Sequence, residues 1–133
     1  MGLLRSDGLV LATPIGSSGY TASAGGPIVH ADIDAIILTP LCPFIKSFSS
    51  MVFSPASLFE LRIEKSSTDC YLTIDGQEGQ LLMPGDEIKV TGMPAAIYFF
   101  NGADRFLERL RLRGFVLEQS VAQEPKPSAT NEN

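Results

Sequence analysis

The segment RSDGLVLATPIGSSGYTASAGGP, residues 5–27, decides how this chain begins to fold. Its first half holds the continuous apolar run Leu9–Ala12, which ends close to a proline and is typical of a buried strand. Residues 17–24 are small apart from one tyrosine, and Gly25-Gly26-Pro27 follows in the order expected just past the end of a helix. We therefore predict a strand, a proline-glycine turn and a short helix.

Beyond this segment, short apolar stretches of period two dominate the chain. Strands are predicted at DAIILTP (34–40), MVFS (51–54), 59–63, 70–74, 87–91 and AAIYFF (95–100). The stretches 59–63 and 70–74 are expected to pair as a hairpin across residues 66–69, and Pro84-Gly85-Asp86 marks a further turn. Residues 104–113 have the apolar spacing of a second helix, although the alternation Leu110–Leu112 also fits a strand. The predicted fold class is mainly β, a sandwich or rolled sheet of many short strands with one or two short helices.

Length and composition limit the organisation and the partners of the chain. Its 133 residues, 44% hydrophobic and 19% charged, have room for one core, which we place in residues 1–118. The polar residues 119–133 are expected to form a disordered tail. A net charge of −5 argues against nucleic acid as a partner, and no apolar stretch approaches the length of about 18 residues needed to span a membrane.

The soft metal ligands are few. One histidine, His30, and two cysteines, Cys42 and Cys70, are too few for a structural zinc site, which usually takes four such ligands, so no metal site is expected. The sequence shows no leader pattern, and two thiols without one are more often reduced and buried than paired. We therefore expect a cytoplasmic location.

The start of the predicted helix is a candidate anion site. The first N–H groups of a helix lack internal partners and lie at the positive end of its dipole, so residues 17–20 could hold a phosphate. In the structural alternative, small residues let the helix lie close to the sheet and Ser17 caps it. Asp7-Gly8 and Asp75-Gly76 likewise fit either ligand-binding positions or turns. The residues alone leave both interpretations open.

Taken together, these motifs resemble those of one protein family. The run SDGLVLATPIGSSGYTASAGGPIV, residues 6–29, resembles the signature of the C-terminal domain of NAD kinases. LTPLCPFIKSF (38–48), TIDGQ (73–77) and PGDEIKV (84–90) resemble further family segments in the same order, so the resemblance covers residues 5 to about 115. Four positions depart from the usual pattern: Ile15, Ser18, Gly19 and Phe44. The last stands where the family often has histidine, so no role of that histidine carries over.

The resemblance implies an NAD pocket. Asp7 would accept from an adenine amino group or a ribose hydroxyl, Tyr20 would offer a ring face and a phenol, and Arg5 would pair with a phosphate. The strand end at Asp75 would contribute from the other side. The implied NAD-binding residues are Arg5, Asp7, Ser18, Gly19, Tyr20, Thr21, Ala22, Ser23, Asp75 and Gln77, with no catalytic residue in this chain.

The implied activity is that of an ATP-dependent NAD kinase, which phosphorylates the adenosine ribose 2′-hydroxyl of NAD to give NADP. In the complete family enzyme, ATP or polyphosphate and a divalent metal such as Mg²⁺ take part, and a preceding domain carries a Gly-Gly-Asp-Gly motif. That motif does not occur here, so we expect a truncated, inactive domain. The resemblance also implies self-association to a dimer or tetramer, through apolar stretches such as AAIYFF and LTPLCPF. The alternatives are the C-terminal domain of a diacylglycerol- or sphingosine-type lipid kinase, or a non-catalytic dinucleotide-binding or assembly module.

Overall fold

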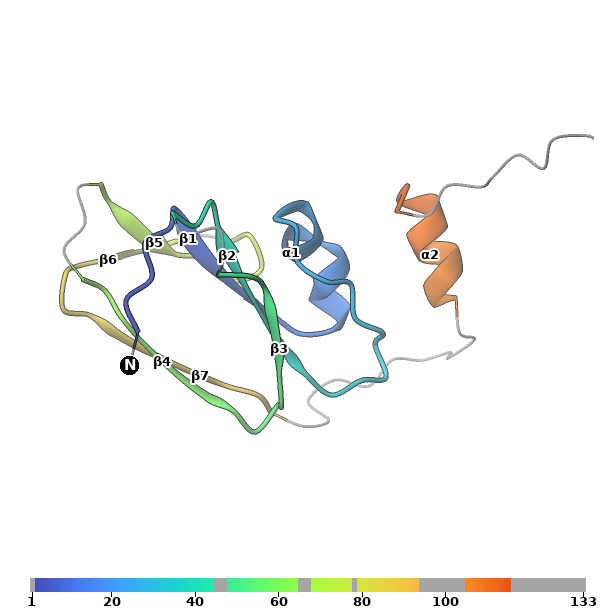
Figure 1. Cartoon of the computed structure of the whole chain (residues 1–133), viewed down its shortest axis with the longest axis horizontal. Helices are drawn as coiled ribbons and strands as arrows, with labels where there is room; N and C mark the ends of the chain where they lie inside the picture. The colour runs from blue at the N-terminus through green and yellow to red at the C-terminus, as the bar shows by residue number, and fades with distance from the viewer. Residues whose placement is uncertain (1, 45–47, 65–67, 78, 94–104, 116–133) are drawn as a thin grey trace, which may run out of the picture. The chain divides into compact units, whose positions relative to one another are not determined.

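The computed structural model describes residues 2–44, 48–64, 68–77, 79–93 and 105–115 (Figure 1). These ranges contain seven strands and three short helical segments, which confirms the mainly β fold class. The chain divides into two compact units, residues 1–100 and 101–133, and each is described by itself. The predicted strand at 95–100 and the predicted tail at 119–133 lie outside the described residues.

Three antiparallel strands form the first sheet, in the order β1 (Gly8–Ala12), β2 (Ile36–Leu41) and β3 (Met51–Phe53). Residues 36–40 of the central strand β2 are all buried, as expected for a strand composed mostly of apolar residues. In the register, Val10 lies opposite Thr39, and Ile37 lies opposite Val52. The predicted strands at 9–12, 34–40 and 51–54 are therefore confirmed.

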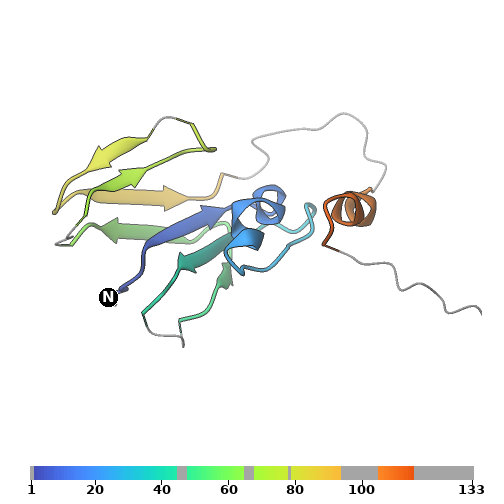
Figure 2. The same cartoon turned by 90° about the horizontal axis from the view of Figure 1, so that it is seen from above.

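The remaining strands pair differently from the prediction. β4 (Leu58–Arg62) pairs with β7 (Glu87–Thr91), and β5 (Cys70–Leu72) pairs with β6 (Gln80–Leu82), all antiparallel (Figure 2). The predicted hairpin between 59–63 and 70–74 is wrong. The physical reason is the tight turn after β5, where Asp75 and Gly76 have φ of 51° and 71° and Gln77 N–H donates to Ile74 O at 3.0 Å. Positive φ at both central positions suits a hairpin turn, so β5 folds back onto β6.

The turn at Pro84-Gly85-Asp86 is confirmed. Gly85 has φ of 99°, and the Asp86 N–H donates to Met83 O at 3.0 Å. Gly85 N–H also donates to Ile63 O at 2.7 Å, so this turn leads the chain from β6 into the ladder beside β4. The β5–β6 hairpin is thus inserted between the two strands of the β4–β7 ladder in the sequence.

The core lies between the first sheet and the β4–β7 pair, as a sandwich requires. Ile36 and Leu38 of β2 form a buried cluster with Phe59 of β4. The rings of Phe53 and Phe59 meet edge to face, with centroids 5.0 Å apart and planes at 89°. Such aromatic pairs add to the stabilisation that comes from area burial. Partly buried residues around the cluster include Leu9, Leu11, Phe48, Phe53 and Val90.

The helices are shorter than predicted. In place of one helix over 17–24 the structure has a 3₁₀ helix, η1 (Ile15–Ser18), and a single α-helical turn, α1 (Tyr20–Ser23). Gly19 separates them with φ of −98° and ψ of −124°, which is not a helical conformation. Helix α2 (Phe106–Leu112), in the second unit, confirms the helix predicted at 104–113. Across the described ranges no helix has the length and apolar composition needed to cross a bilayer.

Candidate functional site

Ser17 makes buried hydrogen bonds that stabilise the segment containing η1 and α1. Its side chain is fully buried, and its hydroxyl accepts the Val29 N–H at 2.9 Å and donates to Pro14 O. A second bond, from the Gly26 N–H to Thr21 O at 2.8 Å, joins α1 to the same following segment. Residues 26–29 are therefore hydrogen-bonded to both η1 and α1.

This arrangement uses two of the backbone N–H groups in the candidate anion site at residues 17–20. The N–H of Ser17 donates to Pro14 O at 3.1 Å, and that of Gly19 donates to Gly16 O at 3.0 Å, so neither is available to a phosphate. A helix of four residues also has little dipole to offer. Ser17 is not a helix cap either, because Pro14 precedes η1 in that position and no side chain caps it.

The implied NAD-binding residues around α1 differ in exposure. Tyr20 is 65% exposed, and Gly19 and Ser23 are exposed beside it. Ser18 and Ala22 are half-buried. Thr21 is only 1% exposed, so in this structure its side chain faces the protein interior and not a ligand in solvent. The surface that α1 offers to a ligand is therefore centred on Tyr20.

Arg5 and Asp7 lie at the other end of β1. The Asp7 N–H donates to Leu41 O at 2.9 Å, and Arg5 O accepts the Phe44 N–H at 2.8 Å, so this segment extends the ladder in place of forming a turn. The five residues of β1 rise about 3.3 Å each, which separates Asp7 from η1 by about 17 Å. Both side chains are exposed, but the structure does not bring them together with Tyr20.

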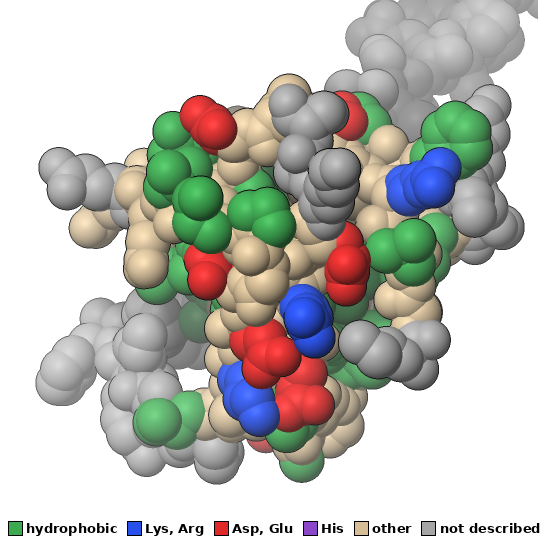
Figure 3. Space-filling model, turned by 90° about the vertical axis from the view of Figure 1, so that its left-hand side faces the viewer, with side chains coloured by type: hydrophobic (Ala, Val, Ile, Leu, Met, Phe, Trp, Pro, Cys, Tyr) green, Lys and Arg blue, Asp and Glu red, His purple; other side chains and the backbone are tan. Residues whose placement is uncertain are grey.

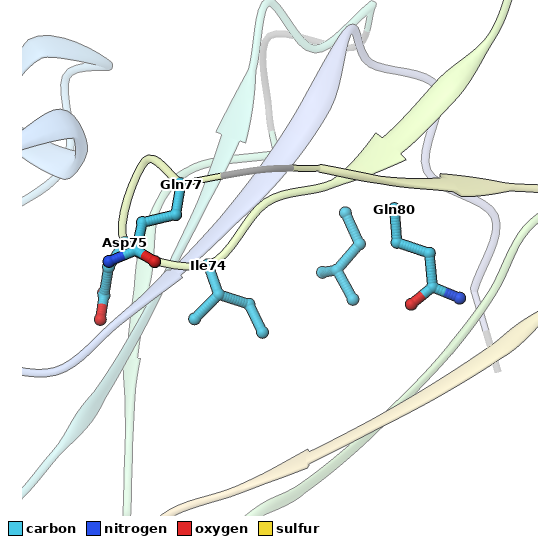
Figure 4. A pocket seen from close by; sticks show the side chains of 5 residues that line it. Ile74, Asp75, Gln77 and Gln80 are labelled. Carbon is cyan, nitrogen blue, oxygen red and sulfur yellow. The ribbon is translucent and has the colours of Figure 1, made fainter.

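The tip of the β5–β6 hairpin forms an open hollow of about 510 Å³ (Figure 4). Asp75 and Gln77, both implied by the resemblance, lie at this tip. The side chains of Ile74 and Gln80 extend to one side of the hairpin and complete the hollow with Leu72. Sequence reasoning missed these three residues, although the strand parity that places Leu72 opposite Gln80 could have indicated the last. The lining combines two apolar side chains, two amides and a carboxylate, a mixture that can contact a polar organic ligand.

The arrangement of charged side chains and of possible metal ligands limits the kinds of ligand that the surface can bind. Within the described ranges, no group of three or more His, Cys, Asp or Glu side chains could hold a metal ion. On the face shown in Figure 3, basic and acidic side chains are mixed and do not form a continuous basic surface. Both cysteines are free, as expected, but Cys42 is exposed and Cys70 is half-buried, so neither thiol is fully buried as predicted.

Comparisons with known proteins agree on one family. The family described as "ATP-NAD kinase C-terminal domain" matches residues 1–101. An NAD kinase from Oleidesulfovibrio alaskensis is 42% identical over 117 residues, covering 87% of this chain and 40% of that protein. A second, from Magnetococcus marinus, is 40% identical over 101 residues, covering 76% of this chain and 33% of that protein. The chain thus spans about 40% of the length of the first curated relatives that it matches.

Solved structures are also similar to this chain. The crystal structure of yeast NADH kinase complexed with NADH has a TM-score of 0.62 and 39% identity, covering 67% of this chain and 26% of that one. The crystal structure of an NAD kinase from Archaeoglobus fulgidus in complex with ATP has a TM-score of 0.68 and 33% identity, covering 81% of this chain and 41% of that one. Because the family match spans three quarters of the sequence and the fold agrees with these structures, the chain belongs to the ATP-NAD kinase C-terminal domain family.

Proposed function

We propose that this chain is the NAD-binding part of an ATP-dependent NAD kinase, which phosphorylates the adenosine ribose 2′-hydroxyl of NAD to give NADP. The observation that carries the proposal is the family match over residues 1–101. A similar solved protein, 39% identical, is an NADH kinase complexed with NADH, which supports a dinucleotide as the ligand. The lipid-kinase alternative finds no support among the relatives described above.

Tyr20 is the centre of the proposed contact with NAD. Its exposed ring can stack on a base, and its phenol can donate or accept a hydrogen bond. Ser23, one helical turn further, adds an exposed hydroxyl that bonds only weakly to Gly19 O, at 3.4 Å. Asp75 and Gln77 supply an acceptor and an amide from the β5–β6 hairpin. Arg5 and Asp7, at the far end of β1, would bind a different part of an extended dinucleotide.

In the proposed reaction NAD is the phosphate acceptor, and a phosphate donor and a metal ion are needed in addition. Phosphoryl transfer requires the γ-phosphate, a divalent metal and the acceptor oxygen to be held together. We propose ATP, or polyphosphate, as the donor with Mg²⁺ in a complete enzyme. The Gly-Gly-Asp-Gly motif of the family does not occur in these 133 residues, so we propose that they bind NAD without transferring phosphate by themselves. We also propose a cytoplasmic location and assembly into a dimer or tetramer.

A titration of the ¹⁵N-labelled chain with NAD, followed by NMR, tests this function. We expect shifts at residues 18–23 and 75–77 and a Kd near the millimolar range. The weakness follows from the absence of two or three hydrogen bonds from other parts of a complete kinase, at about 1 kcal/mol each. Nicotinamide mononucleotide, which lacks the adenosine half, is the control ligand and should perturb these residues less. Absence of saturable shifts, or shifts scattered away from both segments, would overturn the proposal.

A further inference from the structure

Gly26 occupies a position where no side chain fits. A Cβ built on it would lie 2.4 Å from Thr39 Oγ1 and 2.6 Å from Thr21 Cγ2, nearer than real Cβ atoms approach other heavy atoms. Its φ is not in the left-handed region, in contrast to that of Gly25 at 80°. The glycine is therefore required here for close approach and not for its backbone freedom.

The two threonines around Gly26 come from different layers. Thr21 belongs to α1 and Thr39 to the central strand β2, and their side chains are 1% and 0% exposed. Neither hydroxyl has a hydrogen-bond partner among the described residues. A buried hydroxyl without a partner destabilises a fold, so maximal stability does not explain these two threonines. Both side chains instead lie against Gly26, just after α1.

This contact lies directly beneath the proposed ligand-binding surface. Thr21 is the residue after Tyr20, and the Gly26 N–H donates to Thr21 O at 2.8 Å. Since α1 has only four residues, a shift of Thr21 moves Tyr20 and Ser23 with it. Packed interiors transmit such displacements because they contain few voids to absorb them.

We infer that Gly26 and Thr39 are positioning residues for NAD: Gly26 lies against both Thr21 and Thr39, and this contact sets the depth of α1 on the first sheet and thereby the place of the Tyr20 ring. The inference rests on the proposed function, because NAD is the ligand whose binding the contact would control. Neither residue contacts NAD itself. Thr39 lies against Gly26, and Gly26 lies against Thr21, so both act on Tyr20 through Thr21.

The first test compares Gly26→Ala with Gly92→Ala in the NMR titration with NAD. Gly92 is a matched control, because a Cβ there would lie 2.5 Å from Pro55 O, beside the β4–β7 pair and away from α1. Both variants are expected to lower the melting temperature. Only Gly26→Ala is expected to weaken NAD binding of the folded protein, by about tenfold. It should also shift the amide resonances of residues 20–23 before NAD is added.

Thr39→Ala keeps the inference testable if Gly26→Ala does not fold. It removes the hydroxyl that lies against Gly26 and eliminates one unpartnered buried polar group, so its melting temperature should change less than that of Gly26→Ala. NAD affinity should nevertheless fall, by about threefold to tenfold. If Thr39 contributed to stability alone, NAD affinity would not fall in a variant whose melting temperature changes little.

The outcomes separate this inference from the proposed function. A parent chain that does not bind NAD overturns the proposed function and the inference together. If the parent binds while Thr39→Ala, and Gly26→Ala where it folds, bind equally well, only the inference is overturned. Equal losses of affinity in Gly26→Ala and Gly92→Ala would also overturn it, because general destabilisation would then explain both.

Discussion

The buried hydroxyl of Ser17 accepts the backbone N–H of Val29 at 2.9 Å, across a chain separation of twelve residues. Ser17 belongs to the segment that resembles the NAD kinase signature, so a nucleotide contact would be the simplest assumption about it. The structure gives it a different task. Its side chain satisfies a main-chain donor that water cannot reach, and it thereby joins η1 to the segment that follows α1.

Ser17→Ala is expected to destabilise the chain by about 1–3 kcal/mol, because the Val29 N–H would remain buried without a partner. Chemical denaturation measures the free energy of unfolding. Ser23→Ala is the matched control, since among the described residues this exposed hydroxyl makes the single 3.4 Å bond to Gly19 O, and its loss should cost less than about 0.5 kcal/mol. Equal stabilities of the two variants would contradict the role assigned to Ser17.

Lys89 and Glu60 provide a prediction on pH dependence. They lie directly opposite each other in the β4–β7 ladder, with Nζ and Oε1 2.7 Å apart. The hydrogen bond and the charge of Glu60 raise the pKa of Lys89 above 10.5. A raised folded-state pKa means that the stabilisation is fully present below pH 10.5 and is lost as the pH rises through the higher value.

Melting temperatures from about pH 8 to about pH 11 should therefore fall more steeply for the parent chain than for Lys89→Gln. The effect is small, because both side chains are more than 60% exposed and are screened by salt and solvent. Glu60→Gln should also give a shallower fall in melting temperature, since it removes the carboxylate that raises the pKa of Lys89. Parallel curves for all three proteins would show that the pair does not titrate with folding.

Most of the described strands were predictable from local patterns, but β6 (Gln80–Leu82) and the pairing of the strands were not. Alternation identified 59–63, 70–74 and 87–91, because each residue's exposure depends on its own face of a sheet. The choice between the partners of β4 depends on contacts distant in sequence, such as Phe59 opposite Val90. Proximity in the sequence favoured β5 as the partner of β4, whereas the tight turn at Asp75-Gly76 pairs β5 with β6.

The candidate site was predictable as a set of segments and not as a geometry. The resemblance grouped Arg5 and Asp7 with residues 18–23, although the predicted strand between them already implied opposite ends. Burial of Thr21 could not be foreseen, because a threonine in a run of small residues fits either side of a helical turn. Gly19 was predicted to lie within one continuous short helix, whereas in the structure it ends η1 and precedes α1.

Tyr20→Ala is expected to weaken NAD binding by roughly fivefold to a hundredfold, the range that corresponds to losing one aromatic stack on a base. Stability should change little, because the ring is 65% exposed. The NMR titration measures the affinity, and thermal unfolding measures the stability. Tyr71→Ala is a matched control, since that ring is 57% exposed on β5 and outside the proposed contact. Similar losses in both variants would contradict a specific role for Tyr20.

Sedimentation velocity at tens of micromolar should give a mass above the 14.3 kDa of one chain. Three large apolar side chains on the β5–β6 hairpin are exposed by 46–58%: Tyr71, Leu81 and Met83. Their exposure favours association. In the stretch LTPLCPF, residues 38–40 are buried in β2 whereas Phe44 is 79% exposed, and AAIYFF lies outside the described residues. A single species at the mass of one chain would contradict self-association.

The 133-residue polypeptide, incubated with NAD, ATP and Mg²⁺, is expected to form no NADP above a heat-treated sample. General-base assistance alone contributes about 10² to 10⁴ in rate, and positioning of the donor phosphate contributes further, so the loss of both leaves transfer below detection. A complete NAD kinase, assayed in parallel, establishes the detection limit. NADP formation that persists through further purification and falls in Tyr20→Ala would contradict the prediction. It would place the acid-base chemistry within these residues, where Asp7 and Asp75 are the exposed carboxylates of the proposed contacts.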